Sequence, residues 1–108
     1  MNADQYQQLA LRTLAAGLDA RERLTNAALG LSGEAGEFAD AVKKHLFHGH
    51  PLEREALLKE VGDILWYAAL ACDALDTSLG AVMAANIEKL RRRYPEGFSS
   101  ERSQQRSE

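Results

Sequence analysis

The chain of 108 residues has room for one domain of ordinary size. Its formal net charge of −3 disfavours a protein that wraps duplex nucleic acid, because such proteins need a basic surface. The longest apolar run, residues 64–72, is too short to cross a bilayer and no signal peptide is visible, so we expect a cytoplasmic protein with no membrane or nucleic-acid partner.

Apolar residues at helical spacing predict a first helix over about residues 3–16, capped by Asn2 and stopped by Gly17. A second helix is predicted over about residues 26–46, ending before the break at residues 49–51. Ala and Leu dominate the composition, which suits helices packed through small residues, and no segment alternates as a strand does. The expected fold is therefore all-α.

A third helix is predicted over about residues 51–74, and a fourth over about residues 79–94 after a cap at Thr77 or Ser78. Residues 61–75 of the third helix are apolar on nearly every side, and such a helix must be covered on every side. The three other helices of so short a chain cannot do this alone. We therefore expect a homo-oligomer whose copies complete helical bundles.

The tail over residues 99–108 is polar and has no apolar side chain, which predicts disorder. No linker, repeat or low-complexity block divides the rest of the chain. Residues 1–98 are accordingly expected to form one domain of four to five helices.

Two pairs of acidic residues stand out, Glu34 with Glu37 and Glu60 with Asp63. The spacing of three residues places both carboxylates of a pair on one helical face, where like charges repel. Their neighbours are apolar, and burying bare carboxylates is costly. If the second and third helices are antiparallel neighbours, the pairs can form an all-oxygen site for Mg²⁺ or Mn²⁺. The alternative is that these acids lie on a solvated face.

A glycine directly precedes the second acid of each pair, Gly36 in the first and Gly62 in the second. Glycine inside a helix costs about 1 kcal/mol relative to alanine. Two glycines at matching positions therefore predict that the backbones of the second and third helices approach each other closely at these glycines.

The pattern E-x-x-E, a gap and then E-x-x-D resembles the signature of the MazG-type members of the all-α nucleotide pyrophosphohydrolase superfamily. The strings GLSGEAGEFADAVKKHLFHG, LLKEVGDILWYAALA and NIEKLRRRYPEGF resemble the same family, so the resemblance covers about residues 27–98. It implies Mg²⁺-dependent hydrolysis of nucleoside triphosphates to the monophosphate and pyrophosphate, with Mn²⁺ able to substitute. The implied metal ligands and catalytic groups are Glu34, Glu37, Glu60 and Asp63. We further expect a house-cleaning role in the nucleotide pool. We also expect a homo-oligomer, with a tetramer favoured over a dimer.

For the substrate, the resemblance indicates phosphate contacts from Asn86, Lys89 and Arg93, which share one stripe of the fourth helix. The alternative is that basic residues there complement the helix dipole. Tyr67 follows the last motif acid by one helical turn and is expected near the nucleotide or in the core. Lys44 either reaches phosphate or solvates the end of its helix.

Several relatives have an additional Glu directly before the first motif Glu, where it is a suspected water-activating base; here that position is Gly33. Either a motif acid takes the role, or activation depends on the metal alone, or activity is weak. Two other functions stay open, a pyrophosphohydrolase for a specialised nucleotide such as phosphoribosyl-ATP and a non-catalytic helical oligomerisation module. The sequence leaves undecided the base and sugar preference, the number of metal ions, and the choice between dimer and tetramer.

Overall fold

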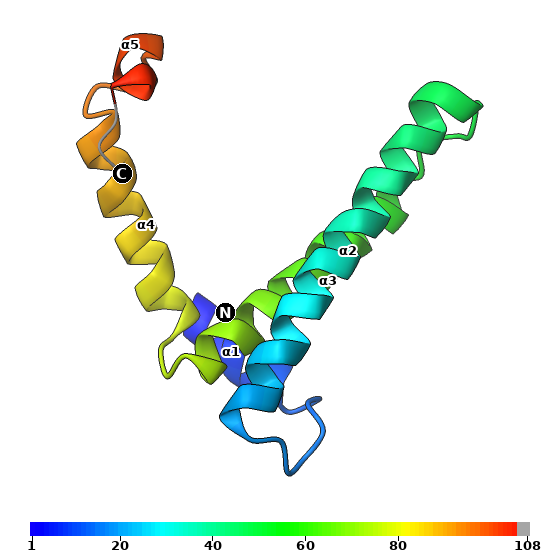
Figure 1. The fold of residues 1–108 in the computed structure, drawn as a ribbon, viewed down its shortest axis with the longest axis vertical. Coiled ribbons are helices and arrows are strands. Elements are labelled where there is room, and N and C mark those ends of the chain that lie inside the picture. The colour runs from blue at the N-terminus through cyan, green and yellow to red at the C-terminus, as the bar shows by residue number, and fades with distance from the viewer. Residues whose placement is uncertain (106–108) are drawn as a thin grey trace.

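The computed structural model of the chain describes residues 1–105. These residues form five helices and no strand: α1 (Ala3–Leu11), α2 (Ala20–His48), α3 (Arg54–Ala74), α4 (Leu79–Arg93) and α5 (Ser100–Gln104). Figure 1 shows α2 and α3 packed as a long hairpin, with α1 beside its base. α4 leaves that base in another direction, bent by 98° from α3. The prediction of an all-α fold is confirmed. The described chain has the shape of a V rather than of a closed bundle.

α2 begins at Ala20, well before the predicted start near residue 26, because a capping box lies in front of it. The carboxylate of Asp19 accepts a hydrogen bond from the Glu22 backbone amide at 2.8 Å. The Glu22 carboxylate in turn accepts one from the Asp19 amide at 3.2 Å. At the other end, Gly49 adopts a left-handed φ of 73° and terminates the helix.

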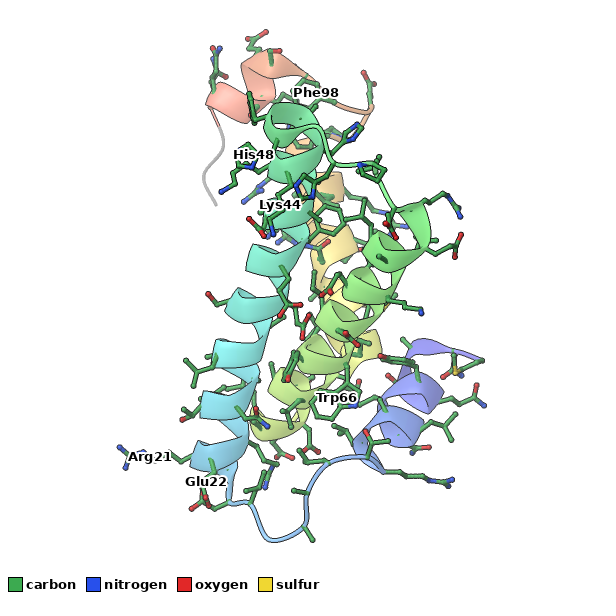
Figure 2. The ribbon with its side chains drawn as sticks, turned by 90° about the vertical axis from the view of Figure 1, so that its right-hand side faces the viewer. Arg21, Glu22, Lys44, His48, Trp66 and Phe98 are labelled. Atoms are coloured by element: carbon green, nitrogen blue, oxygen red, sulfur yellow. The ribbon has the colours of Figure 1, made fainter. Side chains whose placement is uncertain are left out.

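α1 is capped by Asn2 as predicted but ends at Leu11, so its predicted extension to about residue 16 is wrong. A side-chain network replaces the missing helical turn. The Trp66 indole donates to the Ala10 carbonyl at 3.0 Å and to the Thr13 hydroxyl at 2.9 Å. Figure 2 shows the Trp66 side chain reaching from α3 toward α1. The turn after α1 is thereby fixed to α3.

α1 also holds the first turn of α4. The side chain of Gln7 is buried, donates to the Thr77 carbonyl at 3.2 Å and accepts from the Leu79 amide at 2.6 Å. The Asp4 carboxylate accepts from the Gly80 amide at 2.8 Å. A helix start leaves amide groups unsatisfied, and a carboxylate there also complements the helix dipole. These contacts set the direction in which α4 leaves the hairpin.

Replacing Gln7 by alanine is expected to lower the free energy of unfolding by about 1–2 kcal/mol, because two backbone groups of the α3–α4 turn lose their partner. Chemical denaturation measures the change. The neighbouring Gln8 is exposed, so Gln8→Ala is the matched control and should leave stability nearly unchanged. Equal effects of the two substitutions would contradict a specific role of Gln7.

The polar tail contains a short helix within its described part. Ser99 caps α5, and the Arg102 guanidinium donates to the backbone carbonyls of Arg92 and Arg93 at the end of α4. Residues 106–108 lie outside the described residues, and the predicted disorder remains a prediction for them.

Little apolar surface is buried. The buried apolar side chains of the described chain are Ala27, Ala69, Leu70, Cys72 and Leu79. Large apolar side chains remain exposed on both arms of the V: Leu58, Val61 and Leu65 on α3, and Val82, Met83, Ile87 and Leu90 on α4. Among residues 1–105 no single helix is long and apolar enough to cross a membrane, and α3 and α4 meet that criterion only jointly across their bend.

Candidate metal centre

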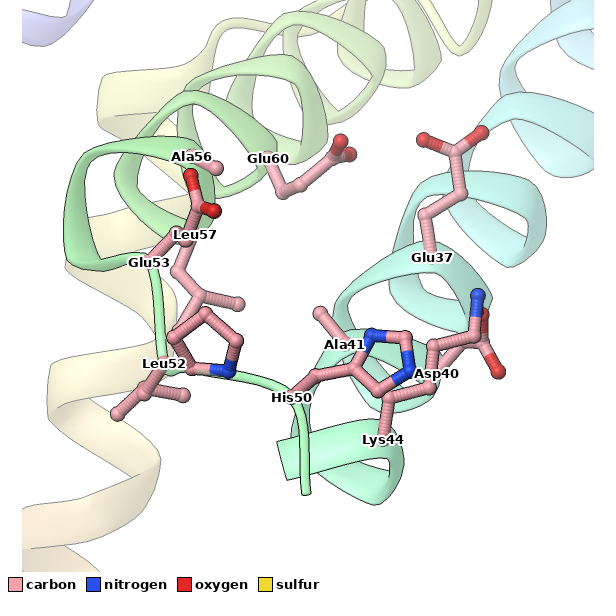
Figure 3. Close-up of a pocket in the computed structure, with 11 residues that line it drawn as sticks. Glu37, Asp40, Ala41, Lys44, His50, Leu52, Glu53, Ala56, Leu57 and Glu60 are labelled. Atoms are coloured by element: carbon pink, nitrogen blue, oxygen red, sulfur yellow. The ribbon is translucent and has the colours of Figure 1, made fainter. Parts of the chain in front are cut away.

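The hairpin brings the two acid pairs together, as the sequence predicts for antiparallel neighbours. Glu34, Glu37 and Glu60 each offer a carboxylate oxygen, and these oxygens lie within 4.8 Å of one another. In Figure 3 the carboxylates of Glu37 on α2 and Glu60 on α3 point toward one another. Asp63 is not in this group of three but lines a cavity with Glu34, next to the cluster. Three of the four predicted ligands therefore form a compact group, with the fourth beside it.

The carboxylates of this cluster disturb each other's ionisation. The negative charge of Glu60 is the main cause of a raised pKa at Glu37. The pKa of Glu60 is raised first by hydrogen bonding with the carboxyl group of Glu34, then by desolvation and by the charge of Glu34. A hydrogen bond between two carboxyl groups exists only while one of them holds a proton. When both carboxyl groups are ionised that hydrogen bond is lost, and their negative charges repel each other.

The cluster fits a hard divalent cation. When Glu34 and Glu60 are ionised, their buried Oε2 atoms have no hydrogen-bond donor in the described part of the chain. Buried acceptors without partners are costly, and a cation satisfies them. All the donors are carboxylate oxygens, which are the ligands that Mg²⁺ and Mn²⁺ prefer.

The raised pKa values predict how the metal-free protein responds to pH. Because Glu37 and Glu60 have pKa values above the ordinary 4.5, the folded state binds protons more tightly than the unfolded chain. Stability from these groups therefore falls as pH rises through the folded pKa values, and is regained as pH falls toward 4.5. In EDTA, we expect the melting temperature to rise when the pH is lowered from neutral to about 5. At neutral pH, we expect the addition of Mg²⁺ to raise the melting temperature.

Thermal denaturation with a Glu37→Gln, Glu60→Gln double variant isolates this effect, since the variant should lose most of the rise. The pKa of Asp40 is lowered, chiefly by its hydrogen bond with Lys44. The stability that Asp40 contributes is therefore lost only below pH 3.8, which is more acidic than the range of this experiment. The wild type and the double variant are compared as the pH is lowered from neutral. If both melting temperatures fall to the same extent, the result would contradict repulsion between the carboxylates of the cluster.

Two cavities flank the cluster along the hairpin. The first, which we call the aromatic cavity, has a volume of about 400 Å³ and is lined by Thr13, Glu34, Asp63, Trp66 and Tyr67. The second, the loop cavity, has a volume of about 260 Å³ and lies toward the α2–α3 loop. Its polar lining residues are Glu37, Asp40, Lys44, His50, Glu53 and Glu60. Each cavity thus includes acids from both helices of the hairpin.

Tyr67 lies in the wall of the aromatic cavity, and Gly30 makes room for it. A Cβ atom on Gly30 would lie 2.2 Å from Cε1 of Tyr67. The close approach of α2 and α3 therefore occurs at Gly30. The predicted close approach at Gly36 and Gly62 is wrong, because a Cβ atom at either glycine meets nothing within 4 Å in the described chain.

The remaining predicted substrate contacts divide between the two arms. Lys44 lines the loop cavity and pairs with Asp40 at 2.9 Å. Asn86, Lys89 and Arg93 lie on α4, which points away from the hairpin (Figure 1). A single chain therefore brings Lys44 and Tyr67 near the acids, but not the three residues of α4.

The structure adds residues that the sequence analysis did not single out. Trp66 and Thr13 line the aromatic cavity, and His50 lines the loop cavity. Tyr6 of α1 has a pKa raised by burial and by the charge of Asp63, which places it near the acids. The position of Trp66 near Asp63 in the sequence was an available signal. Thr13 gave none, since the predicted helix over residues 3–16 included it.

Comparisons with known proteins agree with this geometry. Residues 22–98 match the family described as the MazG nucleotide pyrophosphohydrolase domain. The chain is also 37% identical over 105 residues to the Gene 37 protein of Mycobacterium phage L5, a similarity that covers 90% of this chain and 92% of the relative. No solved structure matches. The family match includes α3, all of α2 except its first two residues, and all four acids, whereas α1 lies outside it.

Proposed function

The chain belongs to the MazG nucleotide pyrophosphohydrolase family, and we propose that it hydrolyses nucleoside triphosphates to the monophosphate and pyrophosphate. In this proposal Mg²⁺ is the cofactor, with Mn²⁺ as a substitute. The metal ligands are Glu34, Glu37, Glu60 and Asp63. The observation that carries the proposal is the cluster of facing carboxylates, whose buried oxygens have no hydrogen-bond donor among residues 1–105.

The reaction needs charge neutralisation, a positioned water and a proton acceptor. A bound divalent cation supplies neutralisation of phosphate charge and a lowered pKa for a coordinated water. The water oxygen bonds to the α-phosphorus, the bond from that phosphorus to the bridging oxygen breaks, and pyrophosphate leaves. Gly33 stands where several relatives have the additional Glu, and we propose that one of the four motif acids accepts the proton of the water instead.

The test is release of pyrophosphate from canonical and modified nucleoside and deoxynucleoside triphosphates, with Mg²⁺, with Mn²⁺ and with EDTA. We expect metal-dependent release, and a preference for modified nucleotides would support the house-cleaning role in the cytoplasm. Phosphoribosyl-ATP is included because a specialised pyrophosphohydrolase would act on it alone. No release from any nucleotide, together with no calorimetric signal for Mg²⁺ or Mn²⁺, would favour the non-catalytic oligomerisation module.

We further propose that the site is completed by a second copy of the chain. The apolar faces of α3 and α4 are exposed, and α4 points away from the hairpin. A second copy laid between the arms would cover these faces and bring its Asn86, Lys89 and Arg93 toward the phosphates. We expect a tetramer in sedimentation experiments. A dimer would also complete the site, whereas a monomer would contradict the proposal of a shared site.

Mixed oligomers test the shared site directly. The variants Glu60→Gln and Lys89→Ala, each weakly active alone, should recover part of the activity when they are unfolded, mixed and refolded together. Recovery is expected because some sites then combine an intact hairpin from one copy with an intact α4 from another. If no activity returns although mixed oligomers form, the two residues act from the same copy.

A further inference from the structure

We infer that Asp4 and Gln7 of α1 are positioning residues for the site that two copies share, because they orient the α4 of their own copy. The inference rests on the proposed function, and it assigns a role to a helix that lies outside the family match. It follows from the contacts of α1 with both arms of the V. In this role the two residues act on the site at the partner's hairpin and not on the acids of their own copy.

The carboxyl end of α1 is fixed to the acid-bearing hairpin. The Trp66 indole on α3 donates to the Ala10 carbonyl at 3.0 Å and to the Thr13 hydroxyl at 2.9 Å. Trp66 comes three residues after Asp63, so this attachment lies within one helical turn of the last motif acid. α1 therefore has a defined position relative to the acids.

The first half of α1 is fixed to three backbone groups at the start of α4. The buried Gln7 side chain donates to the Thr77 carbonyl at 3.2 Å and accepts from the Leu79 amide at 2.6 Å. One planar amide makes both bonds, before and after the capping residue of α4, so it fixes the direction of the turn as well as its distance. The Asp4 carboxylate accepts from the Gly80 amide at 2.8 Å. A Cβ atom on Gly80 would lie 2.6 Å from Oδ1 of Asp4, so this close contact depends on glycine.

The length of α4 magnifies any change at these contacts. Beyond its first turn α4 points away from the hairpin and exposes its apolar side chains (Figure 1). Lys89 and Arg93 follow Leu79 by ten and fourteen residues, or by about 15 and 21 Å at the rise of an α-helix. A change of about 10° in the direction of α4 would displace these two positions by about 3 and 4 Å. Hydrogen bonds to phosphate span only about 2.7–3.2 Å, so such a displacement would break them.

Kinetics separate this role from a general loss of structure. We expect Gln7→Ala to lower kcat/KM for the best triphosphate about tenfold or more, while the affinity for Mn²⁺, measured by calorimetry without nucleotide, changes by less than about twofold. Asp4 is exposed, so Asp4→Ala should fold and should change both constants in the same way. The exposed Gln8 supplies the control, and Gln8→Ala should leave both constants unchanged. Equal losses of metal affinity and of kcat/KM would overturn the inference.

Mixed oligomers show on which copy Gln7 acts. Gln7→Ala keeps its acids and should lose only the direction of its α4, so it should behave like Lys89→Ala. Refolded together, Gln7→Ala and Glu60→Gln should therefore show several times the mean activity of the two separate proteins, whereas Gln7→Ala and Lys89→Ala should show only the mean. The opposite pattern would overturn the inference. Recovery by Glu60→Gln with Lys89→Ala, but not with Gln7→Ala, would also overturn it and would leave the proposed function intact.

The direction of α4 can also be measured without activity. Nitroxide labels at His48→Cys on α2 and Arg91→Cys on α4 report the separation of the arms, since both positions are exposed and the native Cys72 is buried. Dilution with unlabelled protein restricts the measurement to labels in one copy. The two α1 variants are expected to shift or broaden the distances by about 3 Å, whereas the control is not. Unchanged distances in the α1 variants would overturn the inference. Changed distances in a protein whose wild type hydrolyses no triphosphate would overturn the proposed function and confirm that α1 orients α4.

Discussion

Replacing Glu60 by glutamine is expected to reduce metal-dependent pyrophosphate release by at least about a hundredfold. Glu60 contributes an oxygen to the cluster, and its buried Oε2 atom has no hydrogen-bond partner in the described chain. A neutral amide keeps the shape of the side chain but removes the charge that a hard cation needs. Loss of groups that only support a ligand typically costs 10–100-fold, so loss of a ligand should cost at least the upper value.

The same substitution should not unfold the protein. Glutamine removes one of several mutually repelling charges, so the metal-free variant should melt at the wild-type temperature or above it. The control is Glu55→Gln, on the same helix, since Glu55 is exposed, pairs with Arg54 and lies outside the cluster. Steady-state assays and metal titrations on both variants are decisive. Wild-type activity in folded Glu60→Gln protein would exclude Glu60 as a ligand.

Replacing Gly30 by alanine is expected to destabilise the protein by about 2–3 kcal/mol. The new Cβ atom would lie 2.2–2.4 Å from three carbons of the Tyr67 ring, so the ring must move or the helices must separate. Alanine gains about 1 kcal/mol of helix propensity over glycine, which offsets only part of this cost. Because Tyr67 lines the aromatic cavity, we also expect weaker monophosphate binding in any protein that folds.

Gly33→Ala is the matched control on the same helix. A Cβ atom at Gly33 meets nothing within 4 Å in the described chain, so the gain in helix propensity should appear unopposed, as an increase in stability of up to about 1 kcal/mol. Urea denaturation of the two variants compares them directly. An equal change in stability for both would contradict the packing of Tyr67 over Gly30.

The acid cluster could be predicted because its signal is local. Spacing within each helix fixes which side chains share a face, and the short α2–α3 loop makes the helices antiparallel neighbours. The start of α2 could also have been predicted, because Asp19 and Glu22 have the spacing of a capping box. These features depend on residues that are close in the chain.

The other features depend on contacts between distant residues. Gly30 and Tyr67 meet because α2 and α3 take one particular register, which no local pattern specifies. The early end of α1 depends on Trp66, and the direction of α4 depends on Gln7. Such contacts follow from the tertiary arrangement, and helical periodicity alone does not indicate them.

The small core has a consequence for how the chain reaches its folded state. With only five apolar side chains buried among the described residues, an isolated copy has little hydrophobic stabilisation to oppose chain entropy. In the oligomer that we propose, folding and association become one reaction, governed by mass action. The melting temperature should rise with protein concentration, and dilution should unfold the chain as it separates the copies. In that oligomer, the folded fraction of the protein would be set by the total amount of the protein that is present.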